Sequence, residues 1–534
     1  MKKNIQKSRK SILSTIVILC LITTSFSNIS AQKKDYQFKQ GKIFEAKSFT
    51  EDYLGETDEF TFLKCTVWQS LVLEKFDKSL KLVKSAEITL DKGKDELEFV
   101  EMLMTGGTIY LFGEENNKKL ETKVLYVTTI DINTLLPSKD WKKVAESKYI
   151  DDDYHGLFFV NASENGNFIL IAANHMFKED VIRHIDISVF NQKMENQFTG
   201  LFELPFNFEE IGFKFLMMNK TGLTKNHLHI ANDGEVYIMS YINVEELSKK
   251  DLKKGMVQTK LNSSYYLFKF NPEDKTINST EIKMEKYSPI SAILKFDTEN
   301  NPIVAGFYSR GSQYTMNGAY YFKIDNGDLQ VLESEISEFT TEFILNGDKP
   351  GKKDQETLKK EGYLTELACQ LRNVHITENG KIIVVGEYYT TYTVGSGNYR
   401  QTYYVFGDVF IAQFDTKAKS SINSRIVKRS DTSKFSEFGA SSVYVNDNLY
   451  VFFNDATKND NLRNPKDNSV CGLLTKLSSV MVKVDAEGDV NRQKLTDSER
   501  NKTLLKPFFA YERNGKVLLY FEDGSDRNLA EVVF

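Results

Sequence analysis

The chain has 534 residues, with 69 Lys and Arg against 74 Asp and Glu and a formal net charge of −5. This balance lacks the basic footprint that a nucleic acid or an anionic membrane surface requires, so we expect neither as a partner. The 38 Phe and 26 Tyr against only 8 Pro favour strands joined by tight polar turns.

The first 31 residues have the pattern of a secretory signal peptide. Five basic residues precede an apolar run from Ile12 to Ile22, which is too short to span a bilayer at roughly 20 residues. Ala31 offers a small residue at the cleavage point. We therefore expect an exported chain without a transmembrane segment, located in the periplasm, at the outer membrane or outside the cell. An uncleaved anchor or lipidation at Cys20 are the alternatives.

Cleavage would remove five basic and no acidic residues, leaving 64 against 74 and a net charge of −10. Three cysteines would remain, at Cys65, Cys369 and Cys471. They share no metal-ligand spacing, so we expect buried thiols, with one disulfide as the alternative. We expect no cofactor.

Beyond a lead-in at residues 32–60, pairs of short strands recur on Asn-Gly, Asp-Gly or Gly-Gly turns. The clearest of these hairpins occupy residues 97–113, 161–174, 229–241, 375–389 and 510–522. Repeats of this kind indicate a β-propeller, here covering residues 61–534 as one domain.

Six four-stranded units follow one another along the chain. They cover residues 97–133, 155–203, 226–285, 290–335, 370–429 and 440–495. The remaining pieces, 66–89 and 504–534, would combine into one further unit and close the ring with strands from both chain ends. The sequence thus predicts an all-β propeller of seven blades, with six or eight as alternatives. Small helical insertions are predicted at 243–255 and 352–367.

Tyrosines crowd one segment of the fifth unit, which glycines interrupt as in a long projecting hairpin. They are Tyr388, Tyr389, Tyr392, Tyr399, Tyr403 and Tyr404. Exposed tyrosines supply rigid, amphipathic contact area for a protein or a sugar. This hairpin is the first candidate binding surface, and packing between blades is the alternative. The Asn/Asp-rich segment 454–475 is predicted to be an exposed loop on the same rim.

An acidic loop before the second unit is a further candidate. It contains Asp151, Asp152, Asp153 and His155. Three carboxylates and an imidazole can bind calcium or act as acid and base, but the calcium-loop spacing is absent. His227 and His229 alternate on a strand, yet two ligands do not make a zinc site. We therefore predict no metal, and a solvated acidic loop remains the alternative.

The fifth unit carries a distinctive run of residues. A strand begins YVFGD at 404–408, a turn follows at 414–419 (FDTKAK), and the unit ends IVKR at 426–429. In these features the chain resembles exported propeller-like proteins of Bacteroidetes-type bacteria, a group without an established activity. The resemblance implies export and a propeller fold and supplies no catalytic residue. Trp-Asp repeat dipeptides and paired kelch glycines are absent.

The sequence has no Gly-x-Ser-x-Gly elbow, no His-Glu-x-x-His and no phosphate-binding glycine loop. We therefore favour a binding module over an enzyme, with a protein or glycan of the cell envelope as its ligand. One alternative is a propeller enzyme that acts on a polysaccharide with carboxylates at the channel mouth. A structural component of the envelope is the other alternative.

Overall fold

The computed structural model describes most of the chain after residue 35. The described residues are 36–45, 49–67, 70–93, 95–149, 156–175, 183–206, 211–212, 225–243, 264–311, 315–346, 350–364, 366–367, 369–395, 399–433, 437–460, 476–497 and 503–534. The predicted signal peptide, Cys471 and the predicted insertion beyond Asn243 lie outside them.

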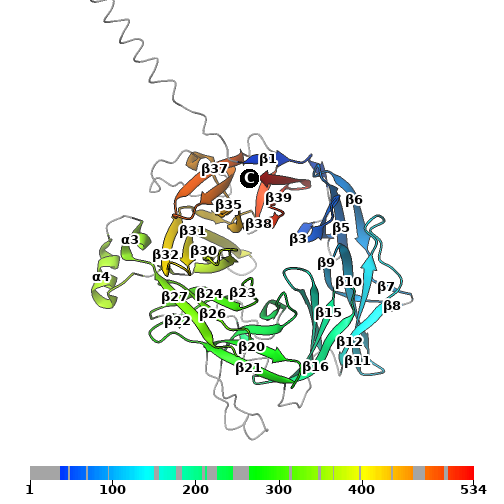
Figure 1. Cartoon of the computed structure of the whole chain (residues 1–534). Helices are drawn as coiled ribbons and strands as arrows, with labels where there is room; N and C mark the ends of the chain where they lie inside the picture. The colour runs from blue at the N-terminus through cyan, green and yellow to red at the C-terminus, as the bar shows by residue number, and fades with distance from the viewer. Residues whose placement is uncertain are drawn as a thin grey trace, which may run out of the picture.

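Within this part of the chain, eight antiparallel sheets of four or five strands follow one another around a ring (Figure 1). We number them as blades 1 to 8. Blade 1 contains β3 (Phe49–Glu56), β4 (Phe60–Val67), β5 (Ser70–Asp77) and β6 (Leu82–Ile88). Blade 2 contains β9 (Glu98–Thr105), β10 (Thr108–Asn117), β11 (Thr122–Ile130) and β12 (Lys142–Lys148). Blade 3 contains β13 (Leu157–Ala162), β14 (Phe168–His175), β15 (Arg183–Asn191) and β16 (Asn196–Leu204).

Blade 4 contains β17 (Ile211–Gly212), β18 (Leu228–Ile230), β19 (Val236–Ile242), β20 (Ser264–Asn271) and β21 (Thr276–Ile282). Blade 5 contains β22 (Ser288–Pro289), β23 (Ile293–Phe296), β24 (Pro302–Ser309), β26 (Gly318–Ile324) and β27 (Val331–Glu338). Blade 6 contains β29 (Cys369–Ile376), β30 (Ile382–Val394), β31 (Gln401–Asp415), β32 (Ser420–Ile426) and β33 (Ser430–Thr432). Blade 7 contains β34 (Ser441–Val445), β35 (Asn448–Ala456), β36 (Leu477–Val484) and β37 (Val490–Asp497). Blade 8 contains β38 (Leu504–Arg513), β39 (Lys516–Asp523), β40 (Asp526–Val533), β1 (Gln37–Gln40) and β2 (Phe44–Glu45).

A few short elements decorate the blades. They are the paired strands β7 (Asp91–Lys92) and β8 (Asp95–Glu96), the paired strands β25 (Thr315–Met316) and β28 (Glu366–Leu367), the helices α3 (Thr341–Leu345) and α4 (Lys352–Glu361), and the 3-10 turns η2 (Lys225–His227) and η4 (Thr457–Asn459). The helices between blades 5 and 6 confirm a helical insertion near the predicted position. No helix of the described residues is long and apolar enough to cross a membrane.

The position of each strand in its blade explains its composition. The second strands β19 and β24 are buried along their whole length, because neighbouring blades cover both of their faces. The outer strand β27 is mostly exposed and is rich in Glu and Ser. The core therefore consists of apolar layers between blades. One such layer joins Val385 and Ile411 of blade 6 to Val451 and Val482 of blade 7.

The ring has eight blades, not the seven that the sequence favoured. Residues 66–89 and 504–534 do not share a blade, because each piece recruits different strands from the N-terminal segment. Strands β3 and β4 complete blade 1, whereas β1 completes blade 8. Strands of the ring thus begin well before residue 61, inside the segment predicted as a lead-in.

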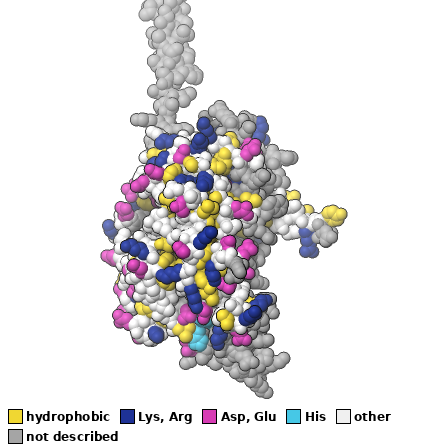
Figure 2. Space-filling model, turned by 90° about the vertical axis from the view of Figure 1, so that its right-hand side faces the viewer, with side chains coloured by type: hydrophobic (Ala, Val, Ile, Leu, Met, Phe, Trp, Pro, Cys, Tyr) yellow, Lys and Arg dark blue, Asp and Glu magenta, His cyan; other side chains and the backbone are white. Residues whose placement is uncertain are grey.

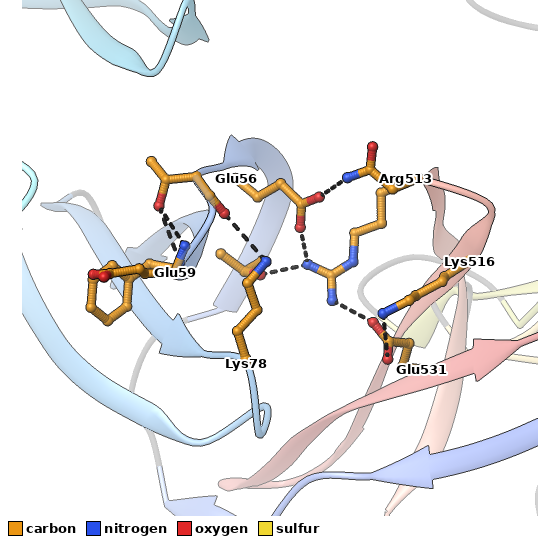
Figure 3. Close-up of polar contacts among 10 residues, drawn as sticks. Glu56, Glu59, Lys78, Arg513, Lys516 and Glu531 are labelled. Atoms are coloured by element: carbon orange, nitrogen blue, oxygen red, sulfur yellow. Dashed lines mark hydrogen bonds and ion pairs between the residues drawn. The ribbon is translucent and has the colours of Figure 1, made fainter.

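Closure by both chain ends is confirmed. The outermost strand of blade 8 is β1, which pairs with β40 from Gln37 opposite Val533 to Gln40 opposite Ala530. Figure 1 shows this N-terminal strand beside the C-terminal strands. On the inner side, Arg513 of β38 donates to Glu56 of β3 at 2.5 Å and to Glu531 of β40 at 2.9 Å (Figure 3). Closure pairs the edge that β40 would otherwise expose.

Antiparallel strand order gives the ring two distinct faces. Turns between the first and second strands of the blades lie on one face, which we call the turn face. Connections between second and third strands lie on the opposite face, which we call the arm face. Seen from the side in Figure 2, the outer surface mixes Lys and Arg with Asp and Glu.

Candidate functional site

Strands β30 and β31 of blade 6 extend together far beyond the rest of their sheet. Strand β29 accompanies β30 only as far as Tyr388, and β32 joins β31 only from Val409 onward. Residues 392–394 pair with residues 401–403, and no third strand of the described residues joins them. We call residues 389–404 the arm. In Figure 2 a slender projection with apolar and basic side chains stands out from the body.

Aromatic and polar contacts brace the arm at Tyr392 and Tyr403, the part that we call its stem. The rings of Tyr392 and Tyr403 stack across the two strands, with centroids 5.2 Å apart and planes inclined by 7°. The hydroxyl of Tyr392 donates to Asp431 beside the arm at 2.9 Å. Hydrogen bonding to this carboxylate raises the pKa of Tyr392 above its usual value. The stem thus holds the tip in a defined direction.

The tip of the arm presents apolar side chains to solvent. Tyr399 is 90% exposed and Val394 is 53% exposed. Residues 396–398, which join the two strands, lie outside the described residues. The predicted projecting hairpin is therefore present, and its most exposed apolar side chains, Tyr399 and Val394, lie at the tip.

The predicted tyrosines fall into three groups. Tyr388 is half-buried against the apolar layer between blades 5 and 6. Tyr389 packs on Phe406 at the base of the arm, with ring centroids 5.2 Å apart. Tyr392 and Tyr403 form the stem, and Tyr399 lies at the tip. The structure thus places three of the six tyrosines, Tyr388, Tyr389 and Tyr404, in packing positions and leaves Tyr399 as the most exposed.

A buried charge cluster anchors the base of the arm. Glu387 has no exposed surface and forms ion pairs with Lys428 and with Arg372, the latter at 2.5 Å. Glu387 Oε2 also accepts a hydrogen bond from the amide of Ala440 in blade 7. The guanidinium of Arg372 lies over the rings of Tyr389, Phe406 and Phe508.

Sequence reasoning missed this cluster. Its signal was a single Glu inside the apolar run of residues 382–389, where a charge needs a buried partner. The cations come from positions 15 and 41 residues away in sequence. Only the folded sheet shows that they meet.

The other predicted rim segments give a mixed result. Asp151, Asp152, Asp153 and His155 lie outside the described residues, as does 461–475 of the long loop. The beginning of that loop is not exposed as predicted. Asn454, Asp455 and Asn459 are buried, and Asp455 pairs with Arg492 at 2.6 Å. Strand β35 runs further than the composition indicated, because hydrogen bonds satisfy these polar side chains. Asn459 donates to Asp455, and Asn454 donates to the carbonyls of Glu437 and Leu505.

The cysteines and histidines of the described part of the chain form no metal centre. Cys65 and Cys369 are buried in different blades, as expected for small apolar side chains. His227 is buried, and burial lowers the pKa of His229 to about 4. No cluster of three potential ligands occurs among the described residues.

A cavity of about 500 Å³ lies beside the innermost strands of blades 5 to 8. Carboxylates of Glu164 and Glu512 and an ammonium group of Lys295 border it. Its lining comes from the ends of first strands, next to the turn face. The arm and this cavity therefore lie toward opposite faces of the ring.

Neither a protein-family model nor a curated protein sequence matches the chain. Its structure is similar to the Dos1 propeller, with a TM-score of 0.34 and 9% identity over 92% of this chain and 94% of that one. The WD40 domain of SCAP from fission yeast gives a TM-score of 0.39 and 6% identity over 95% and 97%. The propeller domain of the Trilobed protease from Pyrococcus furiosus gives 0.33 and 10% over 88% and 100%. These similarities concern the fold alone, and the resemblance to exported bacterial proteins stays a prediction.

Proposed function

We propose that this chain is an exported β-propeller that binds a protein or glycan at the cell envelope, and that the arm makes the contact. The observation that carries the proposal is the braced arm with its apolar tip. Tyr399 and Val394 are exposed together at the end of a projection that paired strands and the Tyr392–Asp431 hydrogen bond hold in place, and this combination favours a contact with another molecule over the chance exposure of a single apolar side chain.

The construction of the arm suits binding. Ordering flexible groups costs free energy on association, and a rigid stem reduces that cost. Tyrosine offers a large apolar face with a polar end and few rotatable bonds. The Tyr392–Tyr403 stack and the Asp431 hydrogen bond supply rigidity, while Tyr399 and Val394 supply contact area.

The alternatives have less support. A polysaccharide-cleaving enzyme needs carboxylates directed at a substrate. Glu164, however, lies 3.6 Å from Lys295, and Glu512 accepts the amide hydrogen bond of Gly515. A structural envelope component would present a broad apolar face. The side of the ring shown in Figure 2 instead has charged side chains of both signs interspersed among the apolar ones.

Export is tested separately from binding. We expect the protein purified from its host to begin at Gln32 by intact-mass measurement, and to fractionate with the envelope or the medium. A chain that keeps residues 1–31 and stays in the cytoplasm would contradict the export part of the proposal.

The binding test compares three forms of the mature chain (32–534) against envelope extract and a panel of soluble glycans. The first is the native sequence, and the second carries Val394→Ser with Tyr399→Ser at the tip. The third carries Leu120→Ser, a matched control because Leu120 is also exposed and lies in an arm-face connection of blade 2. We expect a ligand that the native and control forms retain and the tip variant loses. Equal retention by all three forms would refute the assignment to the arm.

A further inference from the structure

The cavity near the turn face is lined by neutral polar and aromatic side chains together with three charged ones. Its wall comes from β23, β29, β34 and β38, the innermost strands of four consecutive blades. The residues that matter most for its chemistry are Phe296, Asn373, His375, Ser442, Tyr444 and Tyr511. At about 500 Å³ it falls within the range of small-molecule sites.

Uncharged hydrogen-bonding groups dominate one side of the cavity. His375 Nε2 and Ser442 Oγ lie 2.8 Å apart and join blades 6 and 7. Burial, together with the positive charge of Lys295, lowers the pKa of His375 to about 3. The imidazole is therefore neutral at physiological pH and combines one donor with one acceptor. Asn373, two residues earlier on the same strand, adds an amide.

Aromatic rings line the remaining wall. Tyr511 donates its hydroxyl to Asp52 at 2.8 Å, and its ring centroid lies 5.3 Å from that of Tyr53. The hydroxyl of Tyr444 lies 3.3 Å from a carboxylate oxygen of Asp447. Because both hydroxyls are hydrogen-bonded to aspartates of the protein, the two rings contribute mainly apolar surface to the cavity.

The charges around the cavity disfavour a strongly charged ligand. Two carboxylates, Glu164 and Glu512, oppose an anion, whereas Lys295 opposes a cation. Glu164 comes from the turn after β13 in blade 3 and Lys295 from blade 5, so their 3.6 Å pair spans the intervening blade. The neutral imidazole of His375 adds no charge at physiological pH.

We propose that this cavity binds an uncharged saccharide unit. Neutral donors and acceptors match sugar hydroxyls, and aromatic faces match the apolar faces of pyranose or furanose rings. The site lies toward the turn face, and its binding does not depend on the arm. It would let the propeller hold a glycan independently of any partner at the tip.

The test is a titration of the mature chain with glucose, galactose, cellotriose, xylotriose and arabinotriose, followed by calorimetry and saturation-transfer NMR. Glucuronic acid and glucosamine serve as charged counterparts. We expect at least one neutral sugar to bind, and binding to exceed that of both charged sugars. His375→Leu should weaken it at least about tenfold, because buried hydrogen-bonding partners are lost.

Three further variants keep the test decisive if His375→Leu does not fold. Ser442→Ala removes one hydroxyl at little steric cost and should weaken binding severalfold. Lys295→Met should change the affinity for the neutral sugar by less than about threefold, since the ammonium is not its partner. Tyr399→Ser, on the arm, should bind the sugar as the native chain does. Failure of every neutral sugar to bind, or preference for glucuronic acid abolished by Lys295→Met, would overturn the proposal.

Discussion

Arg513 and Glu56 connect the last blade of the ring to the first. Arg513 ends β38, Glu56 ends β3, and the guanidinium donates to the carboxylate at 2.5 Å (Figure 3). The same guanidinium donates to Thr61 of β4 and to Glu531 of β40. One buried side chain thus joins β38 to three other strands at the closure of the ring.

We expect Arg513→Met to destabilise the closed ring by about 3 kcal/mol. Removing one partner of a buried pair costs about 3–5 kcal/mol, because the remaining charges stay buried. The lower value applies here, since Lys516 still lies 3.5 Å from Glu531. Urea unfolding measures the change. Lys516→Met is the matched control and should cost about 0–1 kcal/mol, because the Lys516 side chain is exposed and Glu531 keeps its ion pair with Arg513. Equal effects of the two variants would contradict this role for Arg513.

Glu387→Gln should be strongly destabilising, by about 3–5 kcal/mol, because it leaves the buried Lys428 and Arg372 without their shared carboxylate. Adding Lys428→Met to this variant should recover part of the loss, since one unbalanced charge is then removed. Thermal unfolding of the single and double variants gives the comparison. A double variant that is less stable than Glu387→Gln would show that the charges are not coupled.

The stability of the ring should fall as the pH drops from about 6.5 toward 4. Burial, followed by nearby positive charge, lowers the pKa of folded His375 to about 3 and of folded His229 to about 4. The unfolded chain, with histidine near 6.5, therefore takes up protons first. The contribution of the two neutral histidines to the free energy of unfolding is complete above about pH 6.5, the pKa of histidine in the unfolded chain, and is lost as the pH falls. Urea midpoints between pH 7 and 4.5 measure it. In the double variant His229→Gln/His375→Gln the urea midpoint should change less with pH. An unchanged pH dependence would contradict the assignment of this effect to the two histidines.

Tyr392→Ala should loosen the arm and leave the ring intact. The substitution removes both the stack on Tyr403 and the hydrogen bond to Asp431. Amide hydrogen exchange should accelerate in residues 389–404, while the midpoint of thermal unfolding stays close to that of the native chain. Thr393→Ala, on the same strand, is the control and should leave exchange slow. Acceleration throughout blade 6 would mean that the stem supports the sheet as well as the arm.

Turn chemistry made much of the fold predictable. Gly106 and Gly107 have φ of 56° and 76°, and Asn514 and Gly515 have φ of 49° and 72°. These positive values are those of a tight hairpin turn, which is why such dipeptides identified the repeats correctly. Ring closure also followed from sequence, because an unpaired C-terminal strand needs a partner.

The eighth blade escaped prediction for physical reasons. Strand β1 is short and largely exposed, and its partner β40 lies almost 500 residues away, so no local pattern indicates the pair. Strand β3 contains two irregularities in its register with β4, which break the alternation that identifies a strand. The arm was visible as a tyrosine cluster, whereas the cavity needs residues from five blades and has no local signal.

The most direct test of the account is photo-crosslinking in the native host. A photoreactive phenylalanine would replace Tyr399 at the tip of the arm or, in a matched strain, Leu120 on the same face of the ring. The account predicts a discrete crosslinked product of the exported protein from position 399 and none from position 120. No product from position 399, or the same product from both positions, would contradict the claim that the arm is the contact surface of this propeller.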